Sequence, residues 1–235
     1  MKLTLLQTGD VPVALRPNFG PYAKMFETMF DQTGGAFSYE VIKVSDGAPL
    51  PEPGSVEAIV LPGSAAGVYE DHAWLAPLRE FIRQSYTART PMLGICFGHQ
   101  IMADALGGDV RKSDKGWGLG RHRYDTRQRP SFMQTAPASF AVACSHQDQV
   151  IVAPTEAEVI LASDFTPNAG LAYRNGAALS FQAHPEFDDD YALALAELRR
   201  GNAPDRVIDK AVNSLATPSD SRAMAAYIAA FFNGR

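Results

Sequence analysis

The sequence predicts an α/β fold with a mostly parallel central sheet, helices on both of its faces and antiparallel additions to the same sheet. In the first half of the chain, strand patterns alternate with helix patterns. These strands are nearly continuous apolar runs, which is typical of parallel strands buried on both faces. In the second half, short strands are separated by turn signals, which favours antiparallel or mixed pairing.

The periodicity of the apolar residues defines the elements of the first half. Leu75, Leu78 and Ile82, for example, lie on one face of a predicted helix. We expect strands at residues 2–8, 37–44, 57–63 and 91–96, and helices at residues 21–32, 73–86 and 98–106.

The second half is expected to begin with short strands and to end with helices. The strands are predicted at residues 140–150, 157–164, 171–175 and 178–186, and the helices at residues 189–200, 205–215 and 219–232. Ser219 or Asp220 is suited to cap the last helix. Because no repeat, low-complexity tract or flexible linker interrupts the chain, we expect one domain over residues 1–235.

The composition is that of an ordinary globular protein. The 235 residues are 46% hydrophobic and 20% charged, and the net charge of −5 gives no reason to expect a nucleic acid or an anionic membrane as partner. Two cysteines are too few for a disulfide framework. The first residues lack a signal-peptide pattern, and no run approaches the roughly 18 apolar residues of a membrane span. A soluble cytoplasmic protein is therefore expected.

Cys96 lies at the junction between the strand at 91–96 and the helix at 98–106. It is flanked by glycines in the run Gly-Ile-Cys-Phe-Gly at 94–98. Small neighbours allow the tight strand-to-helix turn that exposes a nucleophile at the carboxyl end of a sheet, and the positive end of the helix favours a thiolate. A buried core cysteine explains Cys96 alone equally well.

His184 and Glu186 lie at the end of the segment predicted at 178–186, directly after its apolar residues. Each has a simpler explanation, as a surface histidine at a strand end and as a solvated carboxylate. A nucleophilic cysteine needs a base, however, and the base needs an anion to orient it. The three residues together favour a Cys-His-Glu triad.

The run Gly-Ile-Cys-Phe-Gly-His-Gln, with His-Pro-Glu later in the chain, resembles the class I, or triad, glutamine amidotransferases. The resemblance implies their flavodoxin-like fold and the catalytic residues Cys96, His184 and Glu186. In that family the cysteine attacks the side-chain amide of glutamine, ammonia leaves, and water hydrolyses a γ-glutamyl thioester. The overall pattern is similar to the amidotransferase half of GMP synthetase, whose relatives include plant enzymes that cut γ-glutamyl bonds in glutathione conjugates.

The resemblance also implies backbone and substrate-binding positions. The N–H groups of Gly63 and Phe97 would form the oxyanion hole, although this chain has Leu-Pro-Gly-Ser where many relatives have Gly-Gly-Pro-Gly. The substrate-binding residues would be Gln100, Ser145 and His146.

Two further features receive simpler interpretations. His99 and Cys144 could join Cys96 in a metal site, but one Cys-x-x-His pair is weak support for zinc, so we expect no metal and no cofactor. His99 is then a structural residue at the start of the helix. The basic stretch at 111–130, within which residues 111–129 hold seven cations, is predicted to be a solvated hairpin face, with a docking surface as the second interpretation.

Three functions follow from these patterns. The first is a free-standing glutamine amidotransferase that passes ammonia to a separate synthase subunit. The second is a γ-glutamyl peptidase or hydrolase with the same triad. The third, a non-catalytic regulatory or binding protein on this scaffold, is disfavoured because all three triad residues are present.

Overall fold

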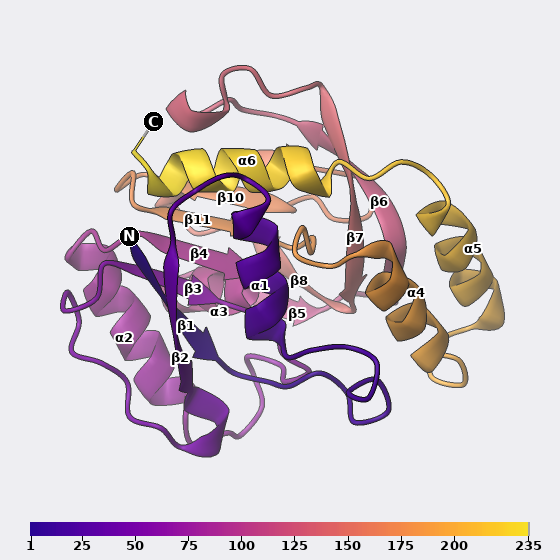
Figure 1. The fold of residues 1–235 in the computed structure, drawn as a ribbon, viewed down its shortest axis with the longest axis horizontal. Helices are drawn as coiled ribbons and strands as arrows, with labels where there is room; N and C mark the ends of the chain where they lie inside the picture. The colour runs from indigo at the N-terminus through magenta and orange to yellow at the C-terminus, as the bar shows by residue number, and fades with distance from the viewer. Residues whose placement is uncertain (235) are drawn as a thin grey trace.

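A computed structural model describes residues 1–234 of the chain. Within them, the main sheet has nine strands in the order β2-β1-β3-β4-β11-β10-β9-β6-β7 (Figure 1). The strands are β1 (Lys2–Gln7), β2 (Ser38–Lys43), β3 (Ala58–Leu61), β4 (Met92–Ile95), β6 (Gly118–Thr126), β7 (Ser139–His146), β9 (Ala157–Ala162), β10 (Gly170–Tyr173) and β11 (Ala178–Phe181).

The sheet has a parallel half and an antiparallel half. The pairs from β2 through β1, β3 and β4 to β11 are all parallel, and the pairs from β11 through β10, β9 and β6 to β7 are all antiparallel. This confirms the predicted α/β fold, with its antiparallel additions continuing the same sheet. The carboxyl ends of β3, β4 and β11 lie next to one another, because these three strands are parallel neighbours.

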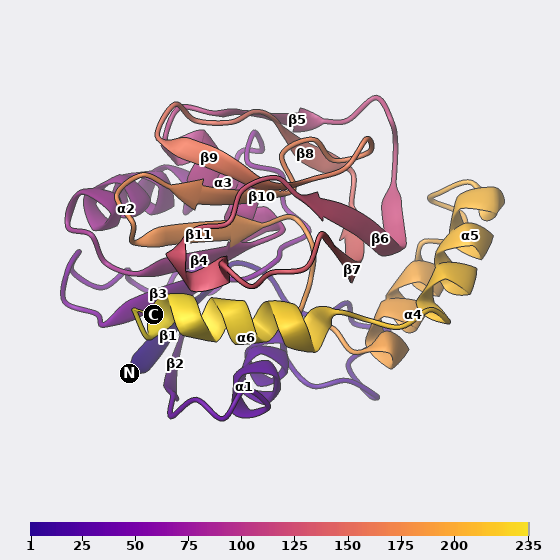
Figure 2. The ribbon, with the colours of Figure 1, turned by 90° about the horizontal axis from the view of Figure 1, so that it is seen from above.

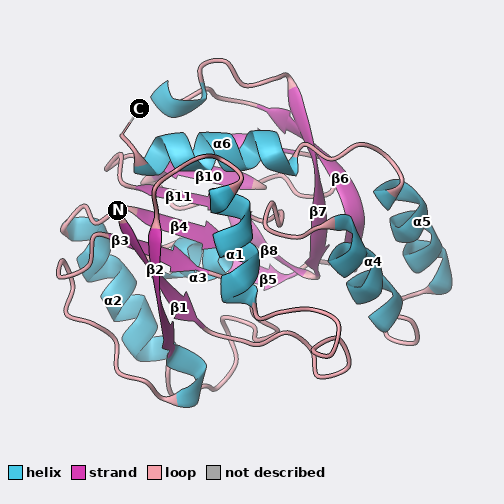
Figure 3. Ribbon diagram, in the orientation of Figure 1, coloured by secondary structure: helices cyan, strands magenta, loops and turns pink. Residues whose placement is uncertain are grey.

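Helices cover both faces of the sheet (Figures 2 and 3). The helices α1 (Tyr22–Asp31) and α6 (Ser221–Phe232) pack on one face, and α2 (Leu75–Thr87) and α3 (Phe97–Ala105) pack on the other. Short 3₁₀ turns lie at Val44–Asp46 and Ser131–Met133. None of the helices within residues 1–234 is long and apolar enough to cross a bilayer.

The segment at 140–150, predicted as one strand, is two strands. β7 ends at His146, and β8 (Asp148–Val152) leaves the main sheet to pair antiparallel with β5 (Asp109–Lys112). The prediction of one strand is wrong because Gln147 breaks the ladder and sends the chain into a second, two-stranded sheet.

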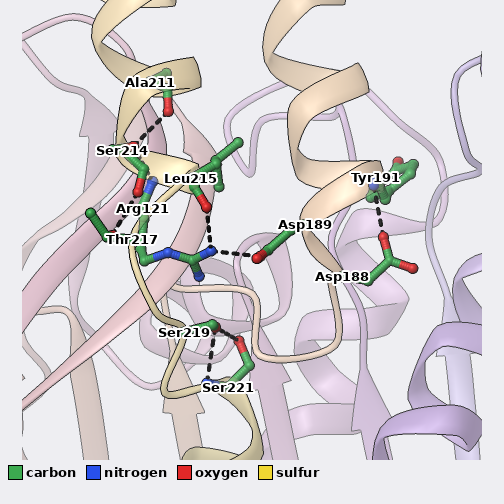
Figure 4. A network of polar contacts seen from close by, with 10 residues as sticks. All are labelled: Arg121, Asp188, Asp189, Tyr191, Ala211, Ser214, Leu215, Thr217, Ser219 and Ser221. Atoms are coloured by element: carbon green, nitrogen blue, oxygen red, sulfur yellow. Dashed lines mark hydrogen bonds and ion pairs between the residues drawn. The ribbon is translucent and has the colours of Figure 1, made fainter.

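The basic stretch at 111–130 is not a hairpin, which corrects the sequence-based interpretation. Its two strands do not pair with each other, because β5 pairs with β8 and β6 pairs with β7 and β9. Nor is all of it solvated: the side chain of Arg121 is only 1% exposed. Its Nη2 donates to Asp189 at 2.6 Å and to the carbonyl of Leu215 at 3.1 Å (Figure 4).

Helices α4 (Asp189–Leu198) and α5 (Asp205–Leu215) lie beside β6 and β7 (Figure 1). The close approach of α5 depends on Gly120, whose φ is +79°. A Cβ on Gly120 would lie 2.5 Å from the Cα of Ala211, so a larger residue would separate the helix from the strand.

The cap predicted for α6 has the expected residue but a different bond. Asp220 is at the N-cap position without a side-chain cap hydrogen bond, and its carboxylate accepts from the backbone N–H of Ala141 on β7 at 2.8 Å. The Ser219 hydroxyl accepts from the N–H of Ser221 at 3.2 Å instead (Figure 4). Asp220 therefore ties α6 to the sheet.

Candidate active site

Cys96 occupies a sharp turn between β4 and α3. Its φ is +53° and its ψ is −102°, a conformation that L-residues rarely adopt. Such a backbone costs on the order of 1–3 kcal/mol, and the surrounding structure must impose it. The N–H of Cys96 is held by the carbonyl of Phe181 on β11 at 2.8 Å.

The two glycines around Cys96 are required by close backbone contacts. A Cβ on Gly98 would lie 1.9 Å from the carbonyl oxygen of Leu61, and a Cβ on Gly94 would lie 2.5 Å from that of Gly98. Both distances are far inside van der Waals contact. The glycines therefore let α3 start directly against β3 and β4, as the sequence predicted for a tight elbow.

His184 and Glu186 form a buried hydrogen-bonded pair beyond the end of β11. The Nδ1 of His184 lies 2.6 Å from Oε1 of Glu186, and the two side chains are 5% and 1% exposed. The backbone N–H of His184 donates to the carbonyl of Ala143 on β7 at 2.8 Å, which fixes the segment on the sheet. With Nδ1 donating to the carboxylate, Nε2 is the nitrogen free to exchange a proton.

The pKa of His184 reflects its charged neighbours. Burial alone would lower the pKa of the imidazole, but the charges of Glu186 and Cys96 and hydrogen bonds to both raise it to about 10. The imidazolium form of His184 is therefore stabilised at neutral pH.

Gly63 lies beside both the cysteine and the histidine. A Cβ on Gly63 would lie 3.7 Å from Cβ of Cys96, 3.8 Å from Nε2 of His184 and only 2.9 Å from its Cε1. The Sγ of Cys96 also lies 3.9 Å from the carbonyl oxygen of Ser145. The structure thus gathers these residues although they are far apart in the chain.

Phe187 is part of the site, and the sequence interpretation missed it. Its ring stacks on the His184 imidazole with centroids 3.9 Å apart and planes within 7°. Tyr191 packs edge-on against Phe187, and its hydroxyl donates to that of Tyr22 at 3.2 Å. The only available signal was a Phe directly after His-Pro-Glu, which does not reveal a stack.

A cleft of about 140 Å³ opens in front of Cys96. This volume is below the range of about 300–1,000 Å³ typical of pockets for drug-sized ligands, so the cleft suits a small molecule. Gln100, Ser145 and His146 all line it, together with the loop of residues 64–70. A larger depression of about 530 Å³ lies behind Glu186, but Cys96 does not line it.

Two of the three predicted substrate-binding side chains form hydrogen bonds within the protein. The amide nitrogen of Gln100 donates to the carbonyl of Asp148 at 2.9 Å and to Gln182 at 3.2 Å. Burial lowers the pKa of His146 to about 3, so this imidazole is neutral, and its Nδ1 lies 3.1 Å from the carbonyl of Asp148. The Ser145 hydroxyl has no partner within residues 1–234.

The remaining predicted residues have distinct places. Phe97 is the first residue of α3, so its N–H is among the helix donors that lack an intrahelical acceptor. His99 is buried in α3, its Nδ1 lies 2.8 Å from the hydroxyl of Ser180, and burial lowers its pKa to about 3. Cys144 is buried on β7, where burial raises the pKa of its thiol to about 12.

The sheet order, the strained cysteine elbow and the adjacent histidine–glutamate pair define a class I amidotransferase-like protein. A family model for glutamine amidotransferase class-I matches residues 24–191, and the chain belongs to this family. The chain is similar to γ-glutamyl peptidase 3 of Arabidopsis thaliana, with 26% identity over 88% of this chain and 86% of that protein. It is 34% identical to the glutamine-hydrolysing GMP synthase of Aquifex aeolicus over 54% of this chain and 24% of that enzyme.

A solved structure supports the same fold. A glutamine amidotransferase from Thermotoga maritima superposes with a TM-score of 0.76 and 19% identity, covering 99% of this chain and 96% of that one. The resemblance predicted from the sequence is confirmed, including its link to GMP synthetase.

Proposed function

We propose that this protein is a cysteine amidohydrolase that cleaves the γ-amide bond of a γ-glutamyl compound, with Cys96 as nucleophile, His184 as base and acid, and Glu186 as the anion that orients the imidazole. The observation that carries the proposal is the 2.6 Å contact between His184 and Glu186 beside a cysteine held at φ +53°. A structural cysteine has no need of this strained backbone.

In the first half of the reaction, Sγ attacks the γ-carbonyl carbon and a C–S bond forms. The proton of the thiol moves to Nε2 of His184, either before the attack or during it. The tetrahedral intermediate collapses when the C–N bond breaks, and the imidazolium gives its proton to the departing amine. A γ-glutamyl thioester remains on Cys96.

In the second half, water takes the place of the amine. The neutral imidazole removes a proton from the water as its oxygen attacks the thioester carbon. The C–S bond then breaks, the proton returns to sulfur, and glutamate leaves. Glu186 stays ionised throughout and stabilises the imidazolium.

The developing negative charge on the carbonyl oxygen requires donors in the cleft. The backbone N–H groups of Gly63 and Phe97 are proposed for this role, each contributing about 3 kcal/mol to transition-state stabilisation. Gln100, Ser145 and His146, which line the cleft, are proposed to contact the substrate.

Two leaving groups suit this chemistry. If the substrate is glutamine, the product is ammonia, which a separate synthase subunit would accept. If the substrate is a γ-glutamyl peptide or amine, no acceptor is needed. The similarity to γ-glutamyl peptidases across most of the chain supports the second possibility.

The test is to label the protein with a glutamine-mimicking electrophile and to locate the adduct by mass spectrometry. We expect one label on Cys96, none on Cys144, and none on Cys96→Ala. His184→Asn should abolish most glutamate release without loss of the fold. A label on Cys144, or an unchanged rate in His184→Asn, would contradict the proposal.

A further inference from the structure

Arg199 is a cation in the wall of the candidate cleft, directly after α4. Its guanidinium carbon lies 4.7 Å from the ring centroid of Trp117, a second residue of the cleft wall. Within residues 1–234 its side chain has no hydrogen bond or ion pair, and its buried Nε has no partner. This residue lies beyond residue 191, where the family match ends.

The neighbouring arginine shows that acids are available in this region. Arg200 is paired with Glu197, Asp205 and Asp209. Arg199 instead turns its guanidinium to Trp117 and the cleft. A buried donor without an acceptor is unfavourable, and five planar N–H donors match a carboxylate with two parallel hydrogen bonds. An unpaired arginine in a cleft is therefore suited to an anionic group of a ligand.

The other cation among the described residues of the cleft wall, Lys112, already has a carboxylate near it. The hydroxyl of Tyr69 donates to the carboxylate of Asp148 at 3.0 Å, and the positive charge of Lys112 acts on that carboxylate. Gln100, Ser145 and His146, the residues proposed to hold the glutamyl half that all these substrates share, lie within the family match at 24–191, whereas Arg199 lies outside it. A substrate group that meets Arg199 therefore belongs to the amine half of the molecule.

We propose that Arg199 binds a carboxylate on the amine half of the substrate, so that the enzyme prefers γ-glutamyl amino acids or peptides to glutamine and to uncharged γ-glutamyl amides. This inference rests on the proposed γ-glutamyl hydrolysis and specifies its leaving group. Trp117 holds the guanidinium plane by stacking, which leaves the edge with its N–H donors free for the carboxylate.

The test compares two substrates that differ only in this carboxylate. γ-Glutamylglycine carries it, and γ-glutamylethylamide has a methyl group in its place. Relative to the ethylamide, Arg199→Gln should lower kcat/KM for γ-glutamylglycine by about 10- to 100-fold, the range for losing a hydrogen bond to a charged group. Arg199→Lys should restore part of this selectivity. Arg206 is an exposed arginine on α5, and Arg206→Gln is the matched control. It should leave kcat/KM for both substrates unchanged.

An equal loss for both substrates would overturn the inference, because Arg199 would then serve the glutamyl half or the fold. Binding to Cys96→Ala, measured by titration calorimetry with and without Arg199→Gln, separates this inference from the proposed function. If γ-glutamylglycine binds in an Arg199-dependent way but the wild type does not hydrolyse it, the proposed hydrolase function is contradicted and the proposed role of Arg199 is supported. If Arg199→Gln changes neither hydrolysis nor binding of γ-glutamylglycine, or if neither compound binds, the proposed role of Arg199 is contradicted.

Discussion

Arg121 of β6 and Asp189 of α4 are joined by a 2.6 Å ion pair in which the two ends have very different surroundings. The arginine side chain is 1% exposed, whereas that of Asp189 is 53% exposed. This pair anchors the first turn of α4, three residues after Glu186 (Figure 4). The buried cation thus connects the antiparallel half of the sheet to the segment that carries His184 and Glu186.

The first prediction concerns the asymmetry of this pair. Asp189→Ala leaves the buried charge of the Arg121 side chain with the Leu215 carbonyl as its only remaining acceptor within residues 1–234. We expect the free energy of unfolding to fall by about 1–2 kcal/mol, discounted because Asp189 is half-exposed. Asp190→Ala removes a carboxylate from the same helical turn, where that residue is exposed without a polar side-chain partner within residues 1–234. Urea unfolding should show the larger loss for Asp189→Ala. Equal losses would mean that only the helix dipole is involved.

Local chemistry explains why the nucleophile elbow was predictable. Gly94 and Gly98 flank Cys96 because backbone atoms leave no room for a Cβ, and this requirement is visible in five consecutive residues. The meeting of Cys96 with His184 follows from strand order, since both leave the carboxyl ends of adjacent parallel strands, β4 and β11.

Features that depend on packing between distant segments were not predictable. The residues around Arg121 in the sequence are those of a solvated stretch, but in the fold its side chain is buried and contacts Asp189 of α4 and Leu215 of α5. Phe187 stacks on His184, and Arg199 enters the cleft, because of the path of the chain after β11. The break between β7 and β8 at Gln147 was hidden for a similar reason, because the partner of β8 is the distant β5.

The second prediction is a pH effect of Glu186→Gln. The negative charge of Glu186 helps to raise the pKa of His184 to about 10, so the imidazolium form persists as the pH rises. Without that charge the pKa of His184 falls, and the proton is lost at lower pH. The alkaline limb of the kcat/KM profile for glutamate release should therefore shift down by about one to three pH units.

Glu70→Gln is the control for this profile, because Glu70 lines the same cleft but bonds to His72 rather than to His184. Its alkaline limb should coincide with that of the wild type. An unshifted limb in Glu186→Gln would show that another group, and not His184, sets the upper pH limit.

The third prediction tests the stack of Phe187 on His184. Phe187→Leu removes the flat surface that holds the imidazole plane, and aromatic contacts of this kind contribute about 0.5–1.5 kcal/mol. If that energy orients the base, kcat should fall by about 3- to 10-fold. Phe140→Leu is the same substitution at another buried phenylalanine, which packs against Tyr227 of α6 rather than against His184. Phe140→Leu should lower the melting temperature and leave kcat unchanged. If its kcat falls as much as that of Phe187→Leu, the loss of activity comes from lower stability and not from the stack on His184.

The fourth prediction uses the strain at Cys96. At an ordinary position, glycine is less favourable than alanine by roughly 0.5–1 kcal/mol, because it loses more conformational freedom on folding. At φ +53° and ψ −102° alanine keeps the strain of about 1–3 kcal/mol that glycine avoids. Cys96→Gly should therefore be at least as stable as Cys96→Ala in urea unfolding, the reverse of the usual order. Both variants should lack glutamate release, so the comparison measures the backbone and not the chemistry. If the urea midpoint of Cys96→Gly is clearly lower than that of Cys96→Ala, the backbone at position 96 is not strained and the prediction is wrong.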